Sequence, residues 1–158
     1  MNSSFELPKQ CAPQIRKFFE YWDSVRGERN CPSRSDLEPS AIPDLLEYIS
    51  LVDVSPETPR FIYRLMGTRV VRLLGNELTG KPVGTGVKSS ELESVLQRYE
   101  NVADNMTPYY HTDLLQEEVN DFTEVERLML PLSEDGKTVN MILCLVYPRP
   151  QRLDKNLF

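Results

Sequence analysis

The residues that most often carry catalysis or bind metals are sparse in this chain. His111 is its only histidine, so a catalytic triad or a histidine-rich metal site would have to be built around that one side chain. It follows Tyr109 and Tyr110 in a polar, strand-like segment, which favours an ordinary strand residue over a ligand. The glycines from Gly75 to Gly86 lack the Gly-Lys-Ser/Thr ending of a phosphate-binding loop. We therefore predict no enzymatic activity and no metal site.

Two pairs of glutamates are the other candidates for acid–base chemistry. Glu117 and Glu118 lie in a loop or strand position with no sign of a pocket around them. Glu124 and Glu126 alternate along a predicted strand, where alternate side chains face the same way. This spacing predicts a solvated acidic strip rather than a catalytic pair.

The three cysteines, Cys11, Cys31 and Cys144, are scattered, and no pair has the close spacing of a zinc or redox motif. Cys144 falls in the most apolar run of the chain, which is typical of a buried thiol. Residues 1–7 lack a signal-peptide pattern, and the longest apolar stretch, 141–147, is too short to span a bilayer. The sequence therefore predicts a cytoplasmic protein.

Length and charge bound the function further. The 158 residues, 40% of them hydrophobic, fit one domain with short flanks. Lysine and arginine number 18 against 24 acidic residues, for a net charge of −6. Such a chain repels phosphate, so we expect neither nucleic acid nor an anionic membrane as its partner. We expect an N-terminal helix and connector over 1–35, the main domain over 36–148 and a tail over 149–158.

An amphipathic helix is predicted over 13–26, with proline in its first turn and Gly27 after its last. Its apolar stripe contains the residues Ile15, Phe18, Phe19, Trp22 and Val25. The three large aromatics need a partner surface, which is either the chain's own domain or a second copy. Phe18, Phe19 and Trp22 are therefore the candidate dimer interface.

Hydrophobic periodicity predicts the remaining elements. Alternation indicates strands over 48–54, 61–66, 108–114, 122–132 and 138–147, and helical spacing indicates helices over 68–74 and 90–106. Capping boxes are read at Ser35–Glu38, before a short helix over 41–46, and at Ser90–Glu93, and Thr68 is read as a cap. The fifth strand is apolar on both faces, so it belongs in the middle of a sheet covered on both sides.

The element order and two motifs resemble the PAS domain family, in a bacterial form common among alphaproteobacteria. In that form a strand ending in YRLxGT is followed by GxELTGK, which matches Tyr63–Thr68 and Gly75–Lys81 here. Trp22 with Arg26-Gly27 and Pro32–Asp36, and Leu130–Ser133 with Asp135-Gly136, are also similar to that family. The resemblance covers roughly residues 22–145.

The resemblance implies an α+β PAS fold: a five-stranded antiparallel sheet of order 2-1-5-4-3, helices on one face and an N-terminal flanking helix. It implies a cytoplasmic sensory or regulatory module that acts by protein–protein contact, with or without gating by a small ligand. Because these residues contain no kinase, cyclase or DNA-binding segment, we expect output through a separate partner, such as a histidine-kinase pathway component. PAS domains commonly dimerise through flanking helices, so a homodimer is expected.

The same resemblance sets the cofactor and ligand expectations. Haem-binding members use a histidine on the long internal helix, which 90–106 lacks, and Asn30-Cys31-Pro32 lacks most of the NCRFLQ-like motif of flavin photoreceptors. We therefore expect no cofactor. The usual cleft between the long helix and the sheet is predicted to be lined by Phe61, Tyr63, Tyr99, Met141 and Leu143, unless these five are ordinary core. The rival functions are a small-ligand binding protein without a partner and a small enzyme, which a cluster of His111 with carboxylates in one pocket would favour.

Overall fold

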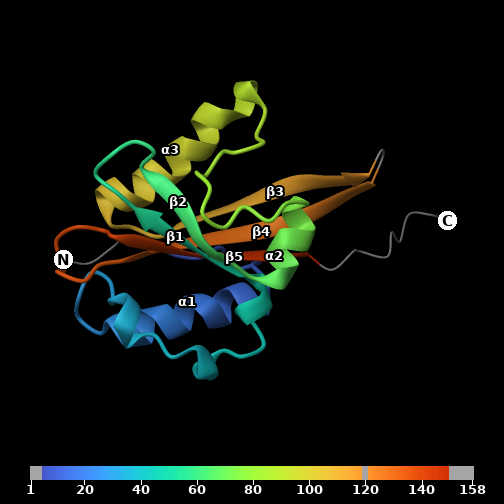
Figure 1. Ribbon diagram of the computed structural model, residues 1–158. Coiled ribbons are helices and arrows are strands. Elements are labelled where there is room, and N and C mark those ends of the chain that lie inside the picture. The colour runs from blue at the N-terminus through green and yellow to red at the C-terminus, as the bar shows by residue number, and fades with distance from the viewer. Residues whose placement is uncertain (1–4, 119–120, 150–158) are drawn as a thin grey trace.

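The computed structural model describes residues 5–118 and 121–149, with the backbone alone at 116–118 and 121–122. Its strands form one antiparallel sheet of order β2-β1-β5-β4-β3 (Figure 1). The strands are β1 (Ile49–Val54), β2 (Phe61–Met66), β3 (Tyr109–Glu118), β4 (Asp121–Leu132) and β5 (Met141–Pro148). The predicted order and the central place of the fifth strand are confirmed.

The sequence of β5 explains its central position. Residues 142–146 are all buried, so both faces of the strand need cover. Leu143 lies opposite Leu51 of β1 on one side and Leu130 of β4 on the other. Its neighbours Ile142 and Cys144 face the opposite way and join a second core. The sheet therefore separates two apolar layers.

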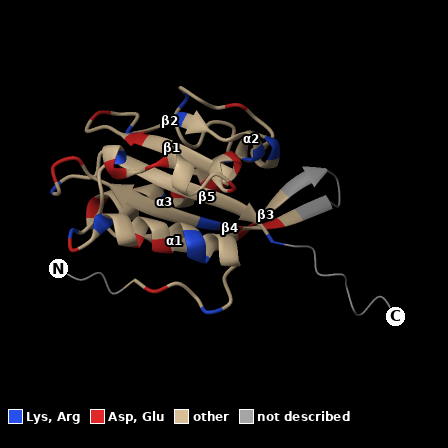
Figure 2. Cartoon of the chain, turned by 90° about the horizontal axis from the view of Figure 1, so that it is seen from below, with Lys and Arg blue, Asp and Glu red and all other residues tan. Residues whose placement is uncertain are grey.

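Helices cover the two faces separately (Figure 1). The helices α2 (Thr68–Leu74) and α3 (Ser89–Asn105) lie on one side, which we name the cleft face. The helix α1 (Pro13–Arg26) and the connector after it cover the other side, which we name the α1 face. Acidic and basic residues are interspersed along α1 and the loops in the view of Figure 2.

The apolar stripe of α1 packs against the chain's own sheet. Ile15, Phe18 and Trp22 are almost completely buried, and the indole Nε1 of Trp22 donates a hydrogen bond to the carbonyl oxygen of Pro131 at 3.0 Å. Phe19 is half-buried, with its ring centroid 5.5 Å from that of Phe5. Burial of each large side chain contributes about 1.5–3 kcal/mol to folding. Two of the three residues predicted at a dimer interface thus lie in the core of the chain itself.

The helix starts differ from the predicted ones. The capping box is formed by Ser33 and Asp36, two residues earlier than predicted, and it opens a 3₁₀ turn at Arg34–Asp36. The segment 41–46 is not an α-helix but lies between the 3₁₀ turns Pro39–Ala41 and Leu46–Tyr48, because Pro39 and Pro43 lack the N–H that a helix requires. Lys88 precedes α3, so Ser90 lies inside the first turn.

Gly67, rather than Thr68, occupies the cap position of α2. A Cβ at Gly67 would lie 2.4 Å from the backbone oxygen of Glu47, so the motif glycine is needed for close approach of two backbone segments. Strand limits also differ: β3 runs to Glu118 rather than to 114, and β5 begins at Met141 rather than at 138. In the turn before β5, the hydroxyl of Ser133 donates to the carbonyl of Thr138 at 2.6 Å and so holds that residue outside the strand.

Candidate ligand cleft

A cavity of about 160 Å³ lies on the cleft face, between the sheet, α3 and the loop that connects α2 to α3. Every strand contributes to it, because the cleft crosses the sheet. Its floor and walls include Ser50, Tyr63, His111, Asp113, Arg127, Met129, Cys144 and Val146 from the strands, with Val95, Arg98 and Tyr99 from α3. Gly84 to Val87 of the loop close one side, and a Cβ at Gly84 would lie 2.4 Å from a methyl carbon of Leu92.

One part of the cavity is apolar and carries two phenols. Tyr63 and Tyr99 are buried, and the apolar side chains of Val95, Met129 and Val146 also line the cavity. Burial raises the pKa of both tyrosines, chiefly through loss of solvation of the phenolate. The hydroxyls therefore remain protonated at neutral pH. Burial also raises the pKa of the Cys144 thiol to about 12, so this cysteine is not a nucleophile.

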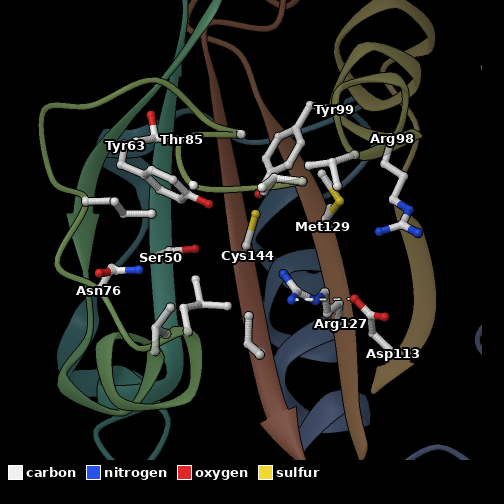
Figure 3. Close-up of a pocket in the computed structure, with 18 of the residues that line it drawn as sticks. Ser50, Tyr63, Asn76, Thr85, Arg98, Tyr99, Asp113, Arg127, Met129 and Cys144 are labelled. Atoms are coloured by element: carbon white, nitrogen blue, oxygen red, sulfur yellow. Dashed lines mark ion pairs between the residues drawn. The ribbon is translucent and has the colours of Figure 1, made fainter. Parts of the chain in front are cut away.

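The other part is a polar corner formed by Arg98, His111, Asp113 and Arg127. Figure 3 shows Arg98 extending from α3 on the same side of the cleft as Arg127 and Asp113, while Ser50 and Asn76 lie on the other side. Arg127 Nη2 is 3.6 Å from Asp113 Oδ2, and this is the ion pair drawn in the figure. Strand register brings the corner together, since His111 lies directly opposite Arg127.

Three nitrogens in this corner are buried without a hydrogen-bond partner among the described residues: Nε of Arg127 and both ring nitrogens of His111. Such atoms are rare in folded proteins, because each gives up its hydrogen bonds to water on burial. Burial, followed by the positive charges of Arg98 and Arg127, lowers the pKa of His111 to about 4. His111 is therefore neutral at pH 7, with one donor and one acceptor nitrogen.

The structure brings only part of the predicted cleft together. Of the five predicted residues, Tyr63 and Tyr99 line the cavity. Phe61 is buried beside Tyr99, with ring centroids 5.6 Å apart, but does not line it. The prediction was wrong for Met141 and Leu143, which belong to the core of the α1 face. The β5 residues that do line the cavity are Cys144 and Val146, whose side chains point to the opposite face of the strand from Met141 and Leu143. Because β5 is apolar on both faces, the sequence does not show which face lines the cavity.

The charged residues of the cleft were missed. The sequence indicates an ordinary strand residue at His111, and it predicts no site role for Arg98, Asp113 or Arg127. The available signal was the two-residue spacing of His111 and Asp113, which places both on one face of a strand. The spacing indicates a site only when the pairing of His111 with Arg127 is known. That pairing cannot be deduced from the sequence of either strand alone.

The predicted acidic strip is also wrong. Glu124 is exposed, but Glu126 is buried under the start of α1 on the α1 face. Its carboxylate accepts hydrogen bonds from the backbone N–H of Ala12, at 3.0 and 3.2 Å, and from the hydroxyl of Tyr110 at 2.7 Å. Arg149 Nε lies 3.5 Å away. A helix that covers the strand therefore turns a surface glutamate into a buried anchor for the helix start.

The arrangement does not favour acid–base catalysis. His111 and Asp113 do enter one pocket, as an enzyme would require, but the carboxylate of Asp113 pairs with Arg127. A histidine with a pKa of about 4 is also a weak base at neutral pH. Among residues 5–118 and 121–149, no cluster of three metal-ligating side chains occurs. In the same part of the chain, no helix combines the length and the apolar character needed to cross a membrane.

Residues 11–147 match the family model of the PAS domain, and this chain belongs to that family. The matched range includes α1. PAS domains are generally sensory, non-catalytic modules of signalling proteins. No curated protein matches the sequence.

Solved structures confirm the fold. The PAS domain of Bordetella pertussis BvgS is similar with a TM-score of 0.53 and 14% identity, over 66% of this chain and 77% of that one. The Rhodobacter sphaeroides LOV protein is similar with a TM-score of 0.52 and 9% identity, over 73% of this chain and 70% of that one. At such identities the likeness concerns the fold alone.

A flavin of the kind bound by photoreceptor relatives does not fit this cleft. A cavity of about 160 Å³ is close in size to one of about 150 Å³ that binds benzene, and pockets for larger ligands start near 300 Å³. Cys31 of the Asn30-Cys31-Pro32 segment lies in the core of the α1 face, on the other side of the sheet. The cavity has room only for a smaller molecule.

Proposed function

We infer that this chain is a cytoplasmic sensory or regulatory PAS module in which a small molecule in the cleft gates contact with a separate signalling protein. The observation that carries this inference is a cavity whose buried nitrogens, on Arg127 and His111, have no partner among the described residues. A bound molecule that supplies acceptors would recover the hydrogen bonds lost on burial. A component of a histidine-kinase pathway is the partner expected from family analogy.

The path from cleft to output runs through β4. Arg127 faces the cleft, and its neighbour Glu126 faces away and accepts the backbone N–H of Ala12 at the start of α1. A ligand that moves Arg127 therefore moves the strand that anchors the flanking helix. If the contact between Glu126 and the start of α1 has two arrangements, α1 presents a different surface in each. A partner protein, or a second copy in a homodimer, could then bind one arrangement in preference to the other. The half-buried Phe19 lies on the helix where such a contact would form.

Native mass spectrometry of protein purified under mild conditions tests this function. It reports the mass of a bound small molecule and the oligomeric state together. We expect a non-covalent adduct that is lost in Val95→Phe, whose added ring fills the cavity from the half-buried face of α3. An adduct that survives in the folded variant would contradict binding in the cleft. Hydrogen exchange at α1 separates a sensor from a simple binding protein, because only a sensor changes exchange there when the ligand leaves.

A further inference from the structure

We propose that the cleft is specific for a small organic carboxylate: one anionic group attached to an apolar body, with roughly six to ten non-hydrogen atoms in all. This rests on the proposed ligand-binding function of the cleft and adds the chemical class of the ligand. Three independent features of the cavity lead to it: the charge balance, the orphaned donors and the size and polarity of the walls.

The charge balance of the polar corner is positive. Arg98 and Arg127 contribute two positive charges, Asp113 contributes one negative charge, and His111 is neutral because its pKa is about 4. Asp113 pairs with Arg127, and the side chain of Arg98 makes no hydrogen bond or ion pair among the described residues. An anion bound here offsets a charge that the protein leaves uncompensated, which an uncharged molecule does not do.

The orphaned nitrogens fit the acceptor pattern of a carboxylate. Nε of Arg127 and the protonated ring nitrogen of His111 are both donors, and both are buried without a partner among the described residues. A carboxylate has two oxygens and only accepts, so it can take both donors at once. Hydrogen bonds between an ionised acceptor and an arginine are also the stronger kind. Figure 3 shows the Arg127 guanidinium beside Asp113, among the side chains that line the cavity.

The rest of the cavity sets the size and polarity of the ligand body. Its volume of about 160 Å³ is close to that of a cavity known to bind benzene. The walls beside the polar corner are supplied by Val95, Met129, Val146 and the ring of Tyr99. A bare inorganic anion would leave this apolar wall without contacts, whereas a phenyl or short alkyl group fills it.

Benzoate and benzamide are matched probes, because they have the same shape and differ in charge. Calorimetric titration should give a benzoate Kd of about 0.01–1 mM, the range for a ligand of this size, and at least about tenfold weaker binding of benzamide. Arg98→Met and Arg127→Met should each weaken benzoate by about tenfold and leave benzamide unchanged. Arg64→Met is the control, since Arg64 is exposed and pairs with Asp53 away from the cavity. Melting curves establish that each variant is folded.

The outcomes separate the two levels of the proposal. Carboxylate specificity would be overturned if benzoate and benzamide bound with equal Kd. It would also be overturned if neither Arg98→Met nor Arg127→Met changed the Kd of benzoate. Inorganic phosphate competing as well as benzoate would show a general anion site and would also overturn it. If uncharged small molecules bind in a manner that Val95→Phe abolishes, the ligand-binding function stands and only the carboxylate is wrong. If no small molecule of either charge binds, both fail.

Discussion

Two neighbouring charged residues of β4 lie on opposite faces of the sheet and differ in how far their hydrogen-bonding groups are satisfied. On the α1 face, Glu126 is buried and fully used, with hydrogen bonds from Ala12 and Tyr110 and an ion pair to Arg149. On the cleft face, Arg127 keeps a buried Nε without a partner among the described residues. Satisfied buried groups fix a structure, and unsatisfied ones mark where a further group is expected. The buried charge on the α1 face is thus satisfied within the chain, whereas the cleft face keeps buried donors for which we propose a ligand.

The largest expected effect lies on the α1 face, at Trp22. Trp22→Glu would place a carboxylate in a 2%-exposed position and remove the hydrogen bond to Pro131. We expect a loss of about 4 kcal/mol or more in unfolding free energy, enough to unfold a marginal domain. Denaturant unfolding measures it. Phe19→Glu is the matched control, because Phe19 is half-buried, and it should cost clearly less.

Sedimentation of the same two variants tests the dimer prediction. If Phe19→Glu splits a dimer and leaves the melting temperature nearly unchanged, the half-buried side of α1 is an interface. Equal stability of Trp22→Glu and the natural chain would show that α1 does not pack as described, and the contrast between the faces would fail.

Glu126 tests whether the α1 face depends on its one buried carboxylate. Glu126→Ala leaves the hydroxyl of Tyr110, the N–H of Ala12 and Arg149 without their acceptor. We expect a loss of about 2–4 kcal/mol in unfolding free energy. Glu124 lies two residues away and its side chain is exposed, so Glu124→Ala should lower the unfolding free energy by less than about 1 kcal/mol. Similar losses for the two variants would mean that Glu126 anchors nothing.

His111, on the cleft face, should make the free energy of unfolding depend on pH. Its pKa falls from 6.5 in the unfolded chain to about 4 in the fold, so the unfolded state binds more protons between these values. Stability is therefore complete above pH 6.5 and is lost as the pH falls toward 4, by about 1–2 kcal/mol after allowance for partial exposure. Arg98, Arg127 and Asp113 are the charged groups that face the ring. Unfolding curves at several pH values should show the slope, and His111→Gln should flatten it.

Arg127 has the smallest expected effect on stability. Arg127→Met removes a donor that has no partner among the described residues and an ion pair 3.6 Å long. We expect a change within about 1 kcal/mol, far below that of its neighbour Glu126→Ala. Denaturant unfolding of both variants side by side measures the contrast. A loss at Arg127 as large as at Glu126 would show that both are structural.

The fold could be predicted from sequence because its signals are local. Alternation gave β2 with its observed limits, the helical stripe gave α1, and the two apolar faces of β5 placed it centrally. The cleft could not be predicted as well, since those same two faces conceal which β5 side chains point into it. Glu126 and Arg127 are both charged residues of one strand, and nothing local in the sequence shows which of them has its partners inside the fold. The contact that buries Glu126 comes from Ala12, 114 residues away. Burial of that kind is decided by tertiary packing.

Coupling between the cleft and α1 is tested most directly by a nitrogen–proton correlation NMR titration with a library of uncharged and anionic fragments of about ten non-hydrogen atoms or fewer. We predict that a binding fragment shifts the amides of Arg127 and Cys144 in the cleft. We also predict a shift at Ala12, whose N–H donates to Glu126 on the far side of the sheet. Shifts confined to the α1 face, with the cleft amides unmoved, would contradict this prediction.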